Sequence, residues 1–373
     1  MKITSVEIVP LLVPFADSPA RQFASSPTQR DNPGILVTAV YVHTDSGPTG
    51  FGYTSQIGSK AAPAIAAYIR EELAPTIVGA NALAPEALWQ RMWGPNKSRM
   101  RGGLGVQALS ALDIACWDIV AKVAGLPLWS ILGGFQRDVP VYGSGGTPNY
   151  LDAELLKECT YFANAGITSY KFKIGDSSVY EGHSSDADRI AMLRKEFGGD
   201  FTLYADANQR YTVSQAIEAS KMLADFDIAW FEEPVLCDLL SDLATVAAAS
   251  PVPVAAGENN YMRWEFREMC TKRAASFLQP DPVLCGEITE FRKIAHLADA
   301  FGLSLCTHLC HELGASLVGA FPSGHSCEYY MQFPTEMWTN DFIPLNGRVT
   351  APDVPGHGLE LSDAARSRYG LHP

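Results

Sequence analysis

From residue 138 onward, eight short apolar runs alternate with segments of helical periodicity, and this repeat limits the fold more than any other feature of the sequence. The runs cover residues 139–142, 169–174, 201–205, 228–231, 252–256, 276–279, 303–306 and 326–330. Short apolar strands separated by helices are typical of βα units that build a parallel sheet. Eight such units close a barrel. We therefore expect a (β/α)8 TIM barrel of the α/β class, with its functional side chains at the carboxyl ends of the strands.

The residues before this repeat have a different pattern. Apolar runs at 8–13 and 35–42 predict strands, and apolar residues at steps of three and four over 106–124 predict a long helix that stops at Gly125. Strands and helices in separate blocks favour an α+β domain. A chain of 373 residues has room for both parts. We expect an N-terminal α+β capping domain over 1–130, the catalytic barrel over 131–345, and a C-terminal tail over 346–373 that packs back on the cap.

Charge and composition argue against several classes of partner. The formal net charge of −13 opposes binding to a phosphate backbone, so we expect no nucleic acid partner. The sequence shows no apolar stretch that we expect to cross a bilayer and no signal peptide at its start, which favours a cytoplasmic protein. The eight cysteines form no CxxC pair, and we interpret them as reduced core residues.

Three carboxylates follow the third, fourth and fifth runs in phase. Asp206, Glu232 and Glu258 are spaced by 26 residues each, one per βα unit. Because parallel strands end at one face of a barrel, these side chains should converge, and their mutual repulsion would require a cation. Ligands that are all oxygen favour a hard ion such as Mg²⁺. The alternative is that each is an ordinary solvated acid at the start of a loop.

The next two units supply a candidate general base. Asp281 follows the sixth run and His308 follows the seventh, 27 residues later. A carboxylate beside an imidazole can hold its tautomer and raise its basicity. A structural histidine is the alternative. His311, three residues further on, is a weaker candidate for contact with the site.

Two lysines and a late glutamate complete the candidates. Lys171 and Lys173 are two residues apart on the second strand and should point to the same side. Their repulsion, burial and a nearby metal would lower the pKa of one of them and make it a base, although both lysines could merely offset the carboxylates. Glu328, on the eighth strand, would donate a hydrogen bond to the substrate carboxylate or restrain it.

Several of these residues stand in short motifs that together resemble the enolase superfamily, and specifically its mandelate racemase branch. The resemblance spans nearly the whole chain and rests on Tyr170-Lys-Phe-Lys173, Ala205-Asp-Ala-Asn208, Phe231-Glu-Glu-Pro234, Ala256-Gly-Glu-Asn259, Gln279-Pro-Asp281 and Thr307-His-Leu-Cys-His-Glu312. The muconate-cycloisomerase-like branch would place a lysine on the sixth strand. This sequence has Ser276-Phe-Leu-Gln-Pro-Asp281 there, which argues against that branch.

The resemblance implies an α+β cap over a modified barrel, and one Mg²⁺ per subunit, with Mn²⁺ as a substitute. The metal ligands would be Asp206, Glu232 and Glu258. Lys173 would face one side of the substrate α-carbon, and the Asp281–His308 pair would face the other.

The resemblance also implies roles around the substrate carboxylate and a state of assembly. Lys171 would contact the carboxylate, Glu328 matches the acid on the last strand, and Asn208 would hydrogen-bond near the metal. Relatives of this kind are homo-oligomers, often octamers.

These groups permit two reactions of a carboxylate substrate. Removal of the α-proton gives an enolate, which can expel a β-hydroxyl (dehydration) or be reprotonated on the other face (racemisation or epimerisation). The cap loop over 15–33 favours a hydroxylated acid because it is long and polar, with Arg21, Gln22, Ser25, Ser26, Thr28, Gln29, Arg30 and Asp31. We therefore expect an acid-sugar dehydratase that binds substrate partly through Arg21, with a six-carbon aldarate such as galactarate or talarate as the first substrate. A noncatalytic binding protein is the remote alternative.

Overall fold

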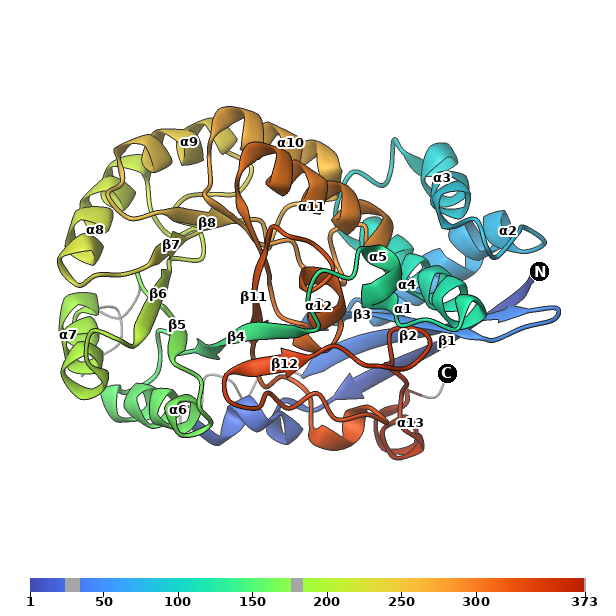
Figure 1. Cartoon of the computed structure of the whole chain (residues 1–373), viewed down its shortest axis with the longest axis horizontal. Coiled ribbons are helices and arrows are strands. Elements are labelled where there is room, and N and C mark those ends of the chain that lie inside the picture. The colour runs from blue at the N-terminus through green and yellow to red at the C-terminus, as the bar shows by residue number, and fades with distance from the viewer. Residues whose placement is uncertain (24–33, 176–183, 372–373) are drawn as a thin grey trace.

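The computed structural model describes residues 1–23, 34–175 and 184–371 and shows a barrel with a second, smaller part beside it (Figure 1). The smaller part is built on an antiparallel sheet in the order β1–β2–β3. These strands span Ile3–Val13, Ile35–Thr44 and Gly50–Ile57. The third strand was not predicted, because its two glycines, Gly50 and Gly52, interrupt the apolar pattern of the run GFGYTSQI.

Helices cover this sheet on one side. They are α1 (Ala62–Tyr68), the π-helical turn η4 (Ile69–Leu73), α2 (Ala74–Ile77), α3 (Pro85–Asn96) and α4 (Leu104–Ala124). Helix α4 packs directly on β3 because Gly50 and Gly52 leave room for it. A Cβ atom at Gly50 would lie 2.0 Å from the carbonyl oxygen of Ala115, and one at Gly52 would lie 2.1 Å from that of Ala111. The close packing of helix and sheet therefore depends on both glycines.

Helix α4 also corrects one expectation from the sequence. Among the described residues it is long and apolar enough to cross a membrane, with a mean hydropathy of 1.4 over 18 residues, whereas we expected no such stretch. The structure accounts for this composition, since 83% of that window is buried inside the protein. The helix lies at the centre of the hydrophobic core of the cap, where it packs against α1, α3 and the sheet.

The barrel has eight parallel strands that close on themselves through the pairing of β11 with β4. The strands are β4 (Asp138–Gly145), β5 (Ser169–Lys173), β6 (Thr202–Asp206), β7 (Trp230–Glu232), β8 (Val254–Ala256), β9 (Phe277–Leu278), β10 (Ser304–Thr307) and β11 (Gly324–Tyr329). Each coincides with one of the eight predicted runs. The predicted fold class, a modified (β/α)8 barrel with an N-terminal α+β part, is confirmed.

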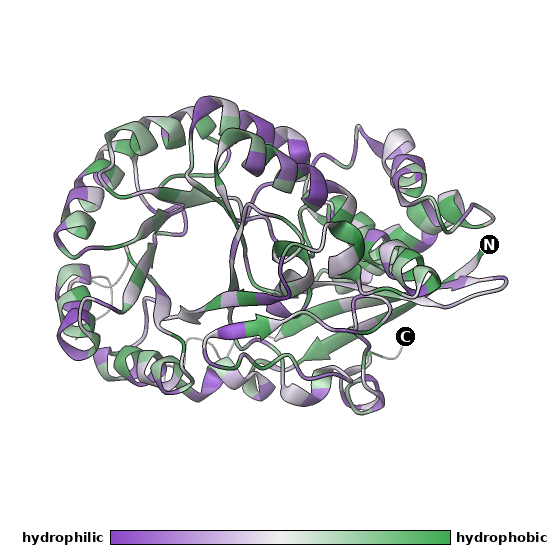
Figure 2. Ribbon diagram, in the orientation of Figure 1, coloured by the Kyte–Doolittle hydropathy of each residue, from purple (hydrophilic) through white to green (hydrophobic). Residues whose placement is uncertain are grey.

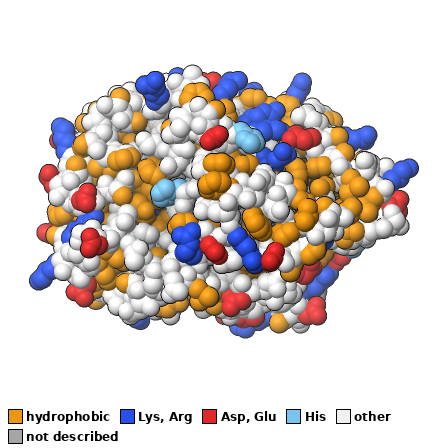
Figure 3. Space-filling view, in the orientation of Figure 1, with side chains coloured by type: hydrophobic (Ala, Val, Ile, Leu, Met, Phe, Trp, Pro, Cys, Tyr) orange, Lys and Arg blue, Asp and Glu red, His pale blue; other side chains and the backbone are white. Residues whose placement is uncertain are grey.

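Seven helices in the described part of the chain connect the strands and form the outer wall of the barrel. They are α6 (Asp152–Asn164), α7 (Asp186–Phe197), α8 (Val213–Asp225), α9 (Leu240–Ala249), α10 (Met262–Lys272), α11 (Ile288–Phe301) and α12 (His311–Val318). Figure 2 shows hydrophilic residues along the outside of these helices, whereas the barrel strands carry both hydrophobic and hydrophilic residues. On the face drawn in Figure 3, acidic and basic side chains are interspersed rather than separated by sign.

Aromatic rings fill the inside of the barrel below the ends of the strands. Tyr142, Tyr204 and Trp230 are buried there with Cys306. The rings of Tyr204 and Trp230 stack with their centroids 3.6 Å apart, and Tyr142 meets Trp230 edge to face at 5.1 Å. The barrel therefore has a packed floor, as barrels of this size do.

After the eighth strand the chain returns to the cap. The segment contains η6 (Thr335–Met337), β12 (Arg348–Thr350), which pairs antiparallel with β4, and α13 (Asp363–Tyr369), which contacts β1. Helix α5 (Leu128–Leu132) contacts both α4 and α12, so we keep the division of the chain at residues 130 and 345 as a proposal. All eight cysteines are free, and seven of them are buried, as expected of core residues.

Several hydrogen bonds join the cap to the segment between β9 and α11 and to the start of α11. Ser110 of α4 accepts a hydrogen bond from the backbone N–H of Gly286 at 3.1 Å, and Asp113 of α4 accepts the backbone N–H and the hydroxyl of Thr289, in the first turn of α11, at 2.8 and 2.7 Å. Trp89 of α3 donates to the carbonyl of Gly286 at 2.9 Å, and Thr54 of β3 donates to that of Val283 at 2.9 Å. The β9–α11 segment is therefore held on its outer side by three different elements of the cap.

Candidate active site

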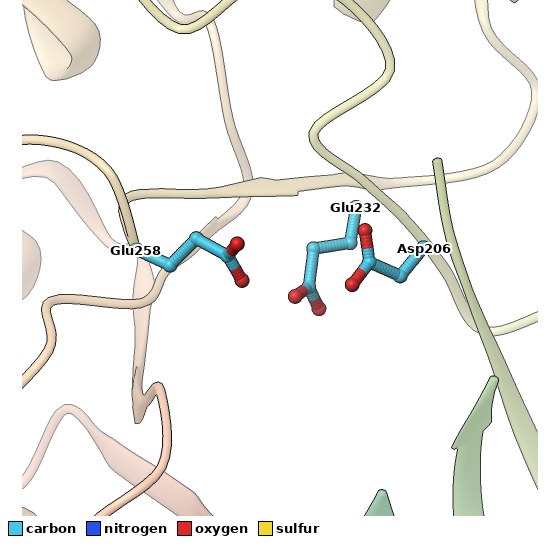
Figure 4. Close-up of side chains that lie close together, drawn as sticks. All are labelled: Asp206, Glu232 and Glu258. Atoms are coloured by element: carbon cyan, nitrogen blue, oxygen red, sulfur yellow. The ribbon is translucent and has the colours of Figure 1, made fainter. Parts of the chain in front are cut away.

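Three carboxylates converge at the carboxyl ends of neighbouring strands. Asp206 ends β6, Glu232 ends β7, and Glu258 lies two residues after β8. Their ligand oxygens lie within 4.8 Å of one another, and all three side chains are buried. Figure 4 shows the three carboxyl groups turned toward a common space. The predicted convergence of the acids is therefore observed.

Fixed donors orient each of these carboxylates. Asp206 accepts the backbone N–H of Asn208 at 2.7 Å, and Glu258 accepts the Asn208 side-chain amide at 3.0 Å. One oxygen of Glu232 accepts hydrogen bonds from Trp230 at 3.1 Å and Gln279 at 2.7 Å. Asn208 thus lies where the resemblance implied. Trp230 and Gln279 were not predicted as site residues, since both also fit an ordinary barrel interior.

The described ionisable groups at the site carry an excess of negative charge that a divalent cation would balance. The three acids lie together with two further carboxylates, Glu328 and Asp281, and with at most three cationic groups, Lys171, Lys173 and protonated His308. Oε2 of Glu258 is buried and forms no hydrogen bond among the described residues. Burial raises the pKa of Glu232 well above its ordinary value, and the charges of Asp206 and Glu258 add to this against that of Lys171. A hard ion with two positive charges fits this set of oxygen donors.

The two lysines of β5 point into the same group of acids. Lys171 is 1% exposed, and its ammonium group contacts Glu232, lies 3.0 Å from Glu328 and lies 3.8 Å from Asp206. Lys173 forms an ion pair with Asp206, its neighbour in the β5–β6 register. Residues two apart on a strand share a face, which is why both lysines reach the site.

The carboxylates around the two lysines raise the pKa of both. Burial lowers the pKa of Lys173, but the charges of Asp206 and Glu258 outweigh burial, so the pKa lies above its ordinary value. The pKa of Lys171 is raised in the same way, by Glu232 and Glu328 against burial. Among the protein's own groups the pKa of both lysines is therefore raised, and the lowered lysine pKa, which was expected with a metal nearby, stays a prediction. Repulsion between the lysines is weaker than the attraction of the acids around them.

His308 lies at the opposite end of the group of acids from β5, just after β10. Its Nδ1–H donates to Asp281 at 2.7 Å, and its Nε2 lies 3.5 Å from Oε2 of Glu258. Burial lowers the pKa of His308, but Glu258 and the hydrogen bond to Asp281 outweigh it and raise the pKa to about 10. The ring is therefore an imidazolium at neutral pH among these groups. The predicted pairing of Asp281 with His308 is present.

Glu328, on β11, is tied to the same groups. It lies 3.0 Å from the Lys171 ammonium and accepts the backbone N–H of Leu309 at 2.8 Å. Burial raises the pKa of Glu328, but Lys171 and His308 more than reverse this and bring the pKa to about 2. An ionised carboxylate only accepts hydrogen bonds, so the geometry favours a restraining role over the donor role considered from the sequence.

Two other candidates lie away from this group. The ring of His311 packs edge to face on Tyr329 at 4.7 Å, and its Nδ1 lies 3.3 Å from Glu312. It lines a separate cavity. Arg21 lies in the short helix η2 (Pro19–Phe23), which contacts α6, and it is not among the lining residues described for the site cavity. The other polar residues of the cap loop, from Ser25 to Asp31, lie outside the described residues.

Glu233 is a buried acid next to the site that the sequence argument passed over. Its backbone has a φ of 35°, and its side chain accepts hydrogen bonds from Gln209 at 2.9 Å and Asn259 at 2.8 Å. Burial raises the pKa of Glu233 to about 8, with Glu258 and Asp206 adding to the effect. The doubled acid of Phe231-Glu-Glu-Pro234 was its signal in the sequence. It orders Asn259, which also donates to Glu258 at 3.3 Å.

A cavity of about 450 Å³ opens beside these groups. Its barrel side carries Lys173, Asp281, His308 and Glu328, and its cap side carries residues of β3 and α4, including Gln56 and Gln107. The catalytic candidates and the cap thus enclose one space large enough for a small organic acid. These residues of β3 and α4 were not predicted as part of the site, whereas the cap loop over 15–33 was.

The site combines a buried carboxylate triad with a lysine pair and a His–Asp pair, all at the carboxyl face of a capped barrel. This combination defines a class of enzymes that act on the carbon next to a substrate carboxylate. Comparison with known proteins agrees. Residues 154–365 match the family described as enolase C-terminal domain-like, and residues 22–133 match the mandelate racemase / muconate lactonizing enzyme N-terminal domain. The chain belongs to the enolase superfamily, in its mandelate racemase branch.

Relatives within this family act on sugar acids. The chain is 34% identical over 333 residues to the 3,6-anhydro-alpha-L-galactonate cycloisomerase of Streptomyces coelicolor, covering 87% of this chain and 89% of that protein. It is 31% identical over 343 residues to the arabinonate dehydratase of Saccharolobus solfataricus, covering 89% and 90%. The crystal structure of an L-talarate dehydratase from Polaromonas sp. JS666, complexed with Mg and L-glucarate, superposes with a TM-score of 0.88 at 28% identity, covering 100% of this chain and 98% of that one.

Proposed function

We propose that this protein is a Mg²⁺-dependent acid-sugar dehydratase, which converts a 2,3-dihydroxy carboxylate into a 2-keto-3-deoxy acid. The observation that carries the proposal is the placement of Lys173 and the Asp281–His308 pair on the wall of one cavity, beside the triad of acids. Dehydration needs a base for the α-proton and an acid for the leaving β-hydroxyl, and this arrangement offers one candidate for each.

The residues that would hold the metal are Asp206, Glu232 and Glu258. When bound, Mg²⁺ would act as a Lewis acid that stabilises negative charge on the substrate carboxylate as the α-proton leaves, and Mn²⁺ would be an alternative. The ammonium group of Lys171 would add positive charge beside the same carboxylate, and Glu328 would restrain it through Lys171, which lies 3.0 Å away.

The proton transfers are assigned to two groups on the wall of the cavity, Lys173 and His308. Lys173 would accept the α-proton as a neutral amine, which requires the charge of Asp206 and Glu258 to be neutralised first, because these acids raise its pKa. His308 would donate its Nε2 proton to the β-hydroxyl as the C–O bond breaks, releasing water. Asp281 holds the ring through Nδ1, and this hydrogen bond, together with the charges of Glu328 and Asp281, raises the pKa of His308 and favours the protonated ring for that step. The resulting enol then tautomerises to the 2-keto acid.

A racemase or epimerase of a 2-hydroxy or sugar acid is the second candidate. The same opposed pair, Lys173 and His308, could remove the α-proton on one face and return one on the other. This reaction leaves the β-hydroxyl in place. The two functions therefore differ in whether a keto product forms.

The test is a screen of the purified protein with Mg²⁺ against aldonic and aldaric acids, with semicarbazide detecting 2-keto products. We expect a product that vanishes with EDTA, with Lys173→Ala and with His308→Asn. Incorporation of solvent deuterium at the α-carbon without keto product would instead support the racemase. Absence of both signals, with an acid still bound, would support a noncatalytic binding protein.

The expected homo-oligomer stays a prediction from the family resemblance. Light scattering of the purified protein measures its mass against the 40.4 kDa of one chain. A mass of eight chains would match the octamer, and a single chain would contradict the prediction.

A further inference from the structure

The part of the cavity wall that comes from the cap is polar but uncharged in the described residues. Ser55 and Gln56 of β3 and Gln107 of α4 lie there, and Gln332 joins them from the segment after β11. Gln56 donates to Gln107 at 2.6 Å, and Gln332 donates to Ser55 at 3.4 Å. We name these four residues the amide wall. Its hydrogen bonds join β3 to α4 and the cap to the barrel.

The cationic groups described on the cavity lining already face carboxylates. Lys173 pairs with Asp206, and His308 pairs with Asp281 and faces Glu258. The other ionisable side chains described on the lining are acids and tyrosines. Within the described part of the chain, a second substrate carboxylate would therefore meet no uncommitted cation. Removing a carboxylate from water without a cationic partner is costly.

The amide wall also has hydrogen-bond acceptors to satisfy. The carboxamide oxygens of Gln56 and Gln332 are buried and have no hydrogen-bond partner among the described residues. Such oxygens need donors. A hydroxyl group donates as well as accepts, whereas a carboxylate only accepts. The wall is thus suited to an uncharged polyhydroxylated chain and poorly suited to a terminal carboxylate.

We propose that the amide wall selects substrates with a single carboxylate. The protein would act on aldonic acids, whose far end is a hydroxymethyl group, in preference to aldaric acids of the same configuration. This inference rests on the proposed acid-sugar dehydratase and replaces the aldarate that the polar cap loop suggested. The substrate carboxylate would lie at the triad and the hydroxylated tail against the amide wall.

The test compares matched pairs of acids that differ only in the terminal group, such as galactonate with galactarate and arabinonate with arabinarate. For the configuration that the enzyme accepts, we expect kcat/KM for the aldonate to exceed that for the aldarate by at least about 100-fold, as expected when a site leaves one polar group of the poorer substrate unpaired. An equal or higher value for the aldarate would overturn the inference and leave the dehydratase intact.

A pair of variants tests the amide wall itself. Gln332→Arg adds a cation and should shift the aldonate-to-aldarate ratio toward the aldarate by at least tenfold. Gln332→Leu removes the same amide without adding charge and should lower kcat/KM for the aldonate without any gain for the aldarate. Equal ratios in the two variants would show that charge at this wall does not set the preference and would overturn the inference.

A binding measurement separates this inference from the proposed reaction. With Mg²⁺ and the Lys173→Ala variant, thermal unfolding is recorded with each acid of a pair. A rise in Tm with the aldonate alone supports the selection, even if the wild-type protein forms no keto product and the dehydratase proposal fails. An equal rise in Tm with the aldarate would overturn the selection of single carboxylates. The absence of a rise with either acid would overturn it as well.

Discussion

Nδ1 of His308 lies 2.7 Å from a carboxylate oxygen of Asp281, so the ring presents Nε2 to the group of acids. The backbone maintains this orientation. Leu309 and Cys310 follow His308 with φ values of 49° and 45°, and this sharp turn leads from β10 into α12. The direction of the reactive nitrogen is therefore set both by a side-chain hydrogen bond and by the path of the chain.

Replacement of Asp281 by Asn should disable His308 without unfolding the site. The Asn side chain keeps the shape but lacks the charge that holds Nδ1 protonated, so we expect kcat to fall by about 10²–10⁴-fold. Steady-state kinetics on the substrate found in the screen measures the loss, with Asp299→Asn on the exposed side of α11 as the control. A kcat within threefold of the wild type would exclude Asp281 from the reaction.

The metal site should depend on each acid of the triad. Calorimetric titration should show Mg²⁺ binding to the wild type and none to Asp206→Asn, Glu232→Gln or Glu258→Gln. At a Mg²⁺ concentration of 100 times Kd, binding should stabilise the wild type by about 2.7 kcal/mol, and EDTA should remove this gain. Glu218→Gln, in an exposed ion pair on α8, is the control. Undiminished binding by any of the triad variants would remove that residue from the ligand set.

Glu287 should lower the free energy of unfolding of the wild-type protein. Its backbone has a φ of 94° and a ψ of −136°, and both side-chain oxygens are buried without a hydrogen-bond partner among the described residues. Burial also raises the pKa of its carboxyl well above the ordinary value. Glu287→Gly relieves the backbone strain and removes the buried acid, so we expect a gain of about 1–3 kcal/mol in the free energy of unfolding.

A second variant at this position separates the two causes. Glu287→Ala removes the carboxyl but keeps a Cβ atom at positive φ, so it should be less stable than Glu287→Gly by about 1 kcal/mol. Urea denaturation of the three proteins measures both differences. Equal stability of the Ala and Gly variants would show that backbone strain contributes nothing.

Glu158 should make stability depend on pH. This residue of α6 is 1% exposed and accepts hydrogen bonds from the backbone of Gly146 at 2.6 Å and from Tyr170 at 2.5 Å. Burial raises its pKa to about 7 against these hydrogen bonds, compared with an ordinary value of 4.5. Because the folded state holds the proton more tightly, Glu158 lowers the free energy of unfolding as pH rises from about 4.5 to 7, by about 1–3 kcal/mol.

Glu158→Gln carries no titrating proton and should lack this contribution. The variant should therefore gain stability relative to the wild type by about 1–3 kcal/mol between pH 4.5 and 8, as measured by urea denaturation at both values. A stability difference that is constant with pH would contradict the raised pKa of Glu158.

The repeat of the sequence predicted the barrel and the group of acids because both depend on periodicity. One acid per βα unit places Asp206, Glu232 and Glu258 on one face whatever the lengths of the strands. This robustness mattered, since β9 has only two residues and β7 and β8 have three each. The two-residue spacing of Lys171 and Lys173 likewise predicted their common direction.

The cap side of the site could not be predicted in the same way. Gln56 and Gln107 are neutral residues, the first on a strand whose apolar pattern is interrupted by glycines and the second on a largely apolar helix. Nothing local distinguishes them from surface glutamines, and their proximity arises only when the cap packs on the barrel. The pKa of Lys173 among these groups could not be predicted for a related reason. It depends on distances to Asp206 and Glu258 that the order of residues does not contain.

The fastening of the β9–α11 segment to the cap has a consequence for how such proteins can diversify. Asp281 lies in this segment, whose carbonyls at Val283 and Gly286 accept hydrogen bonds from Thr54 and Trp89, so the cap that covers the substrate also shapes the support of His308. Exchange of the cap with that of a relative would alter both at once. New specificities in this lineage should therefore arise by substitutions within a resident cap, or by recombination events that carry the β9–α11 segment together with it.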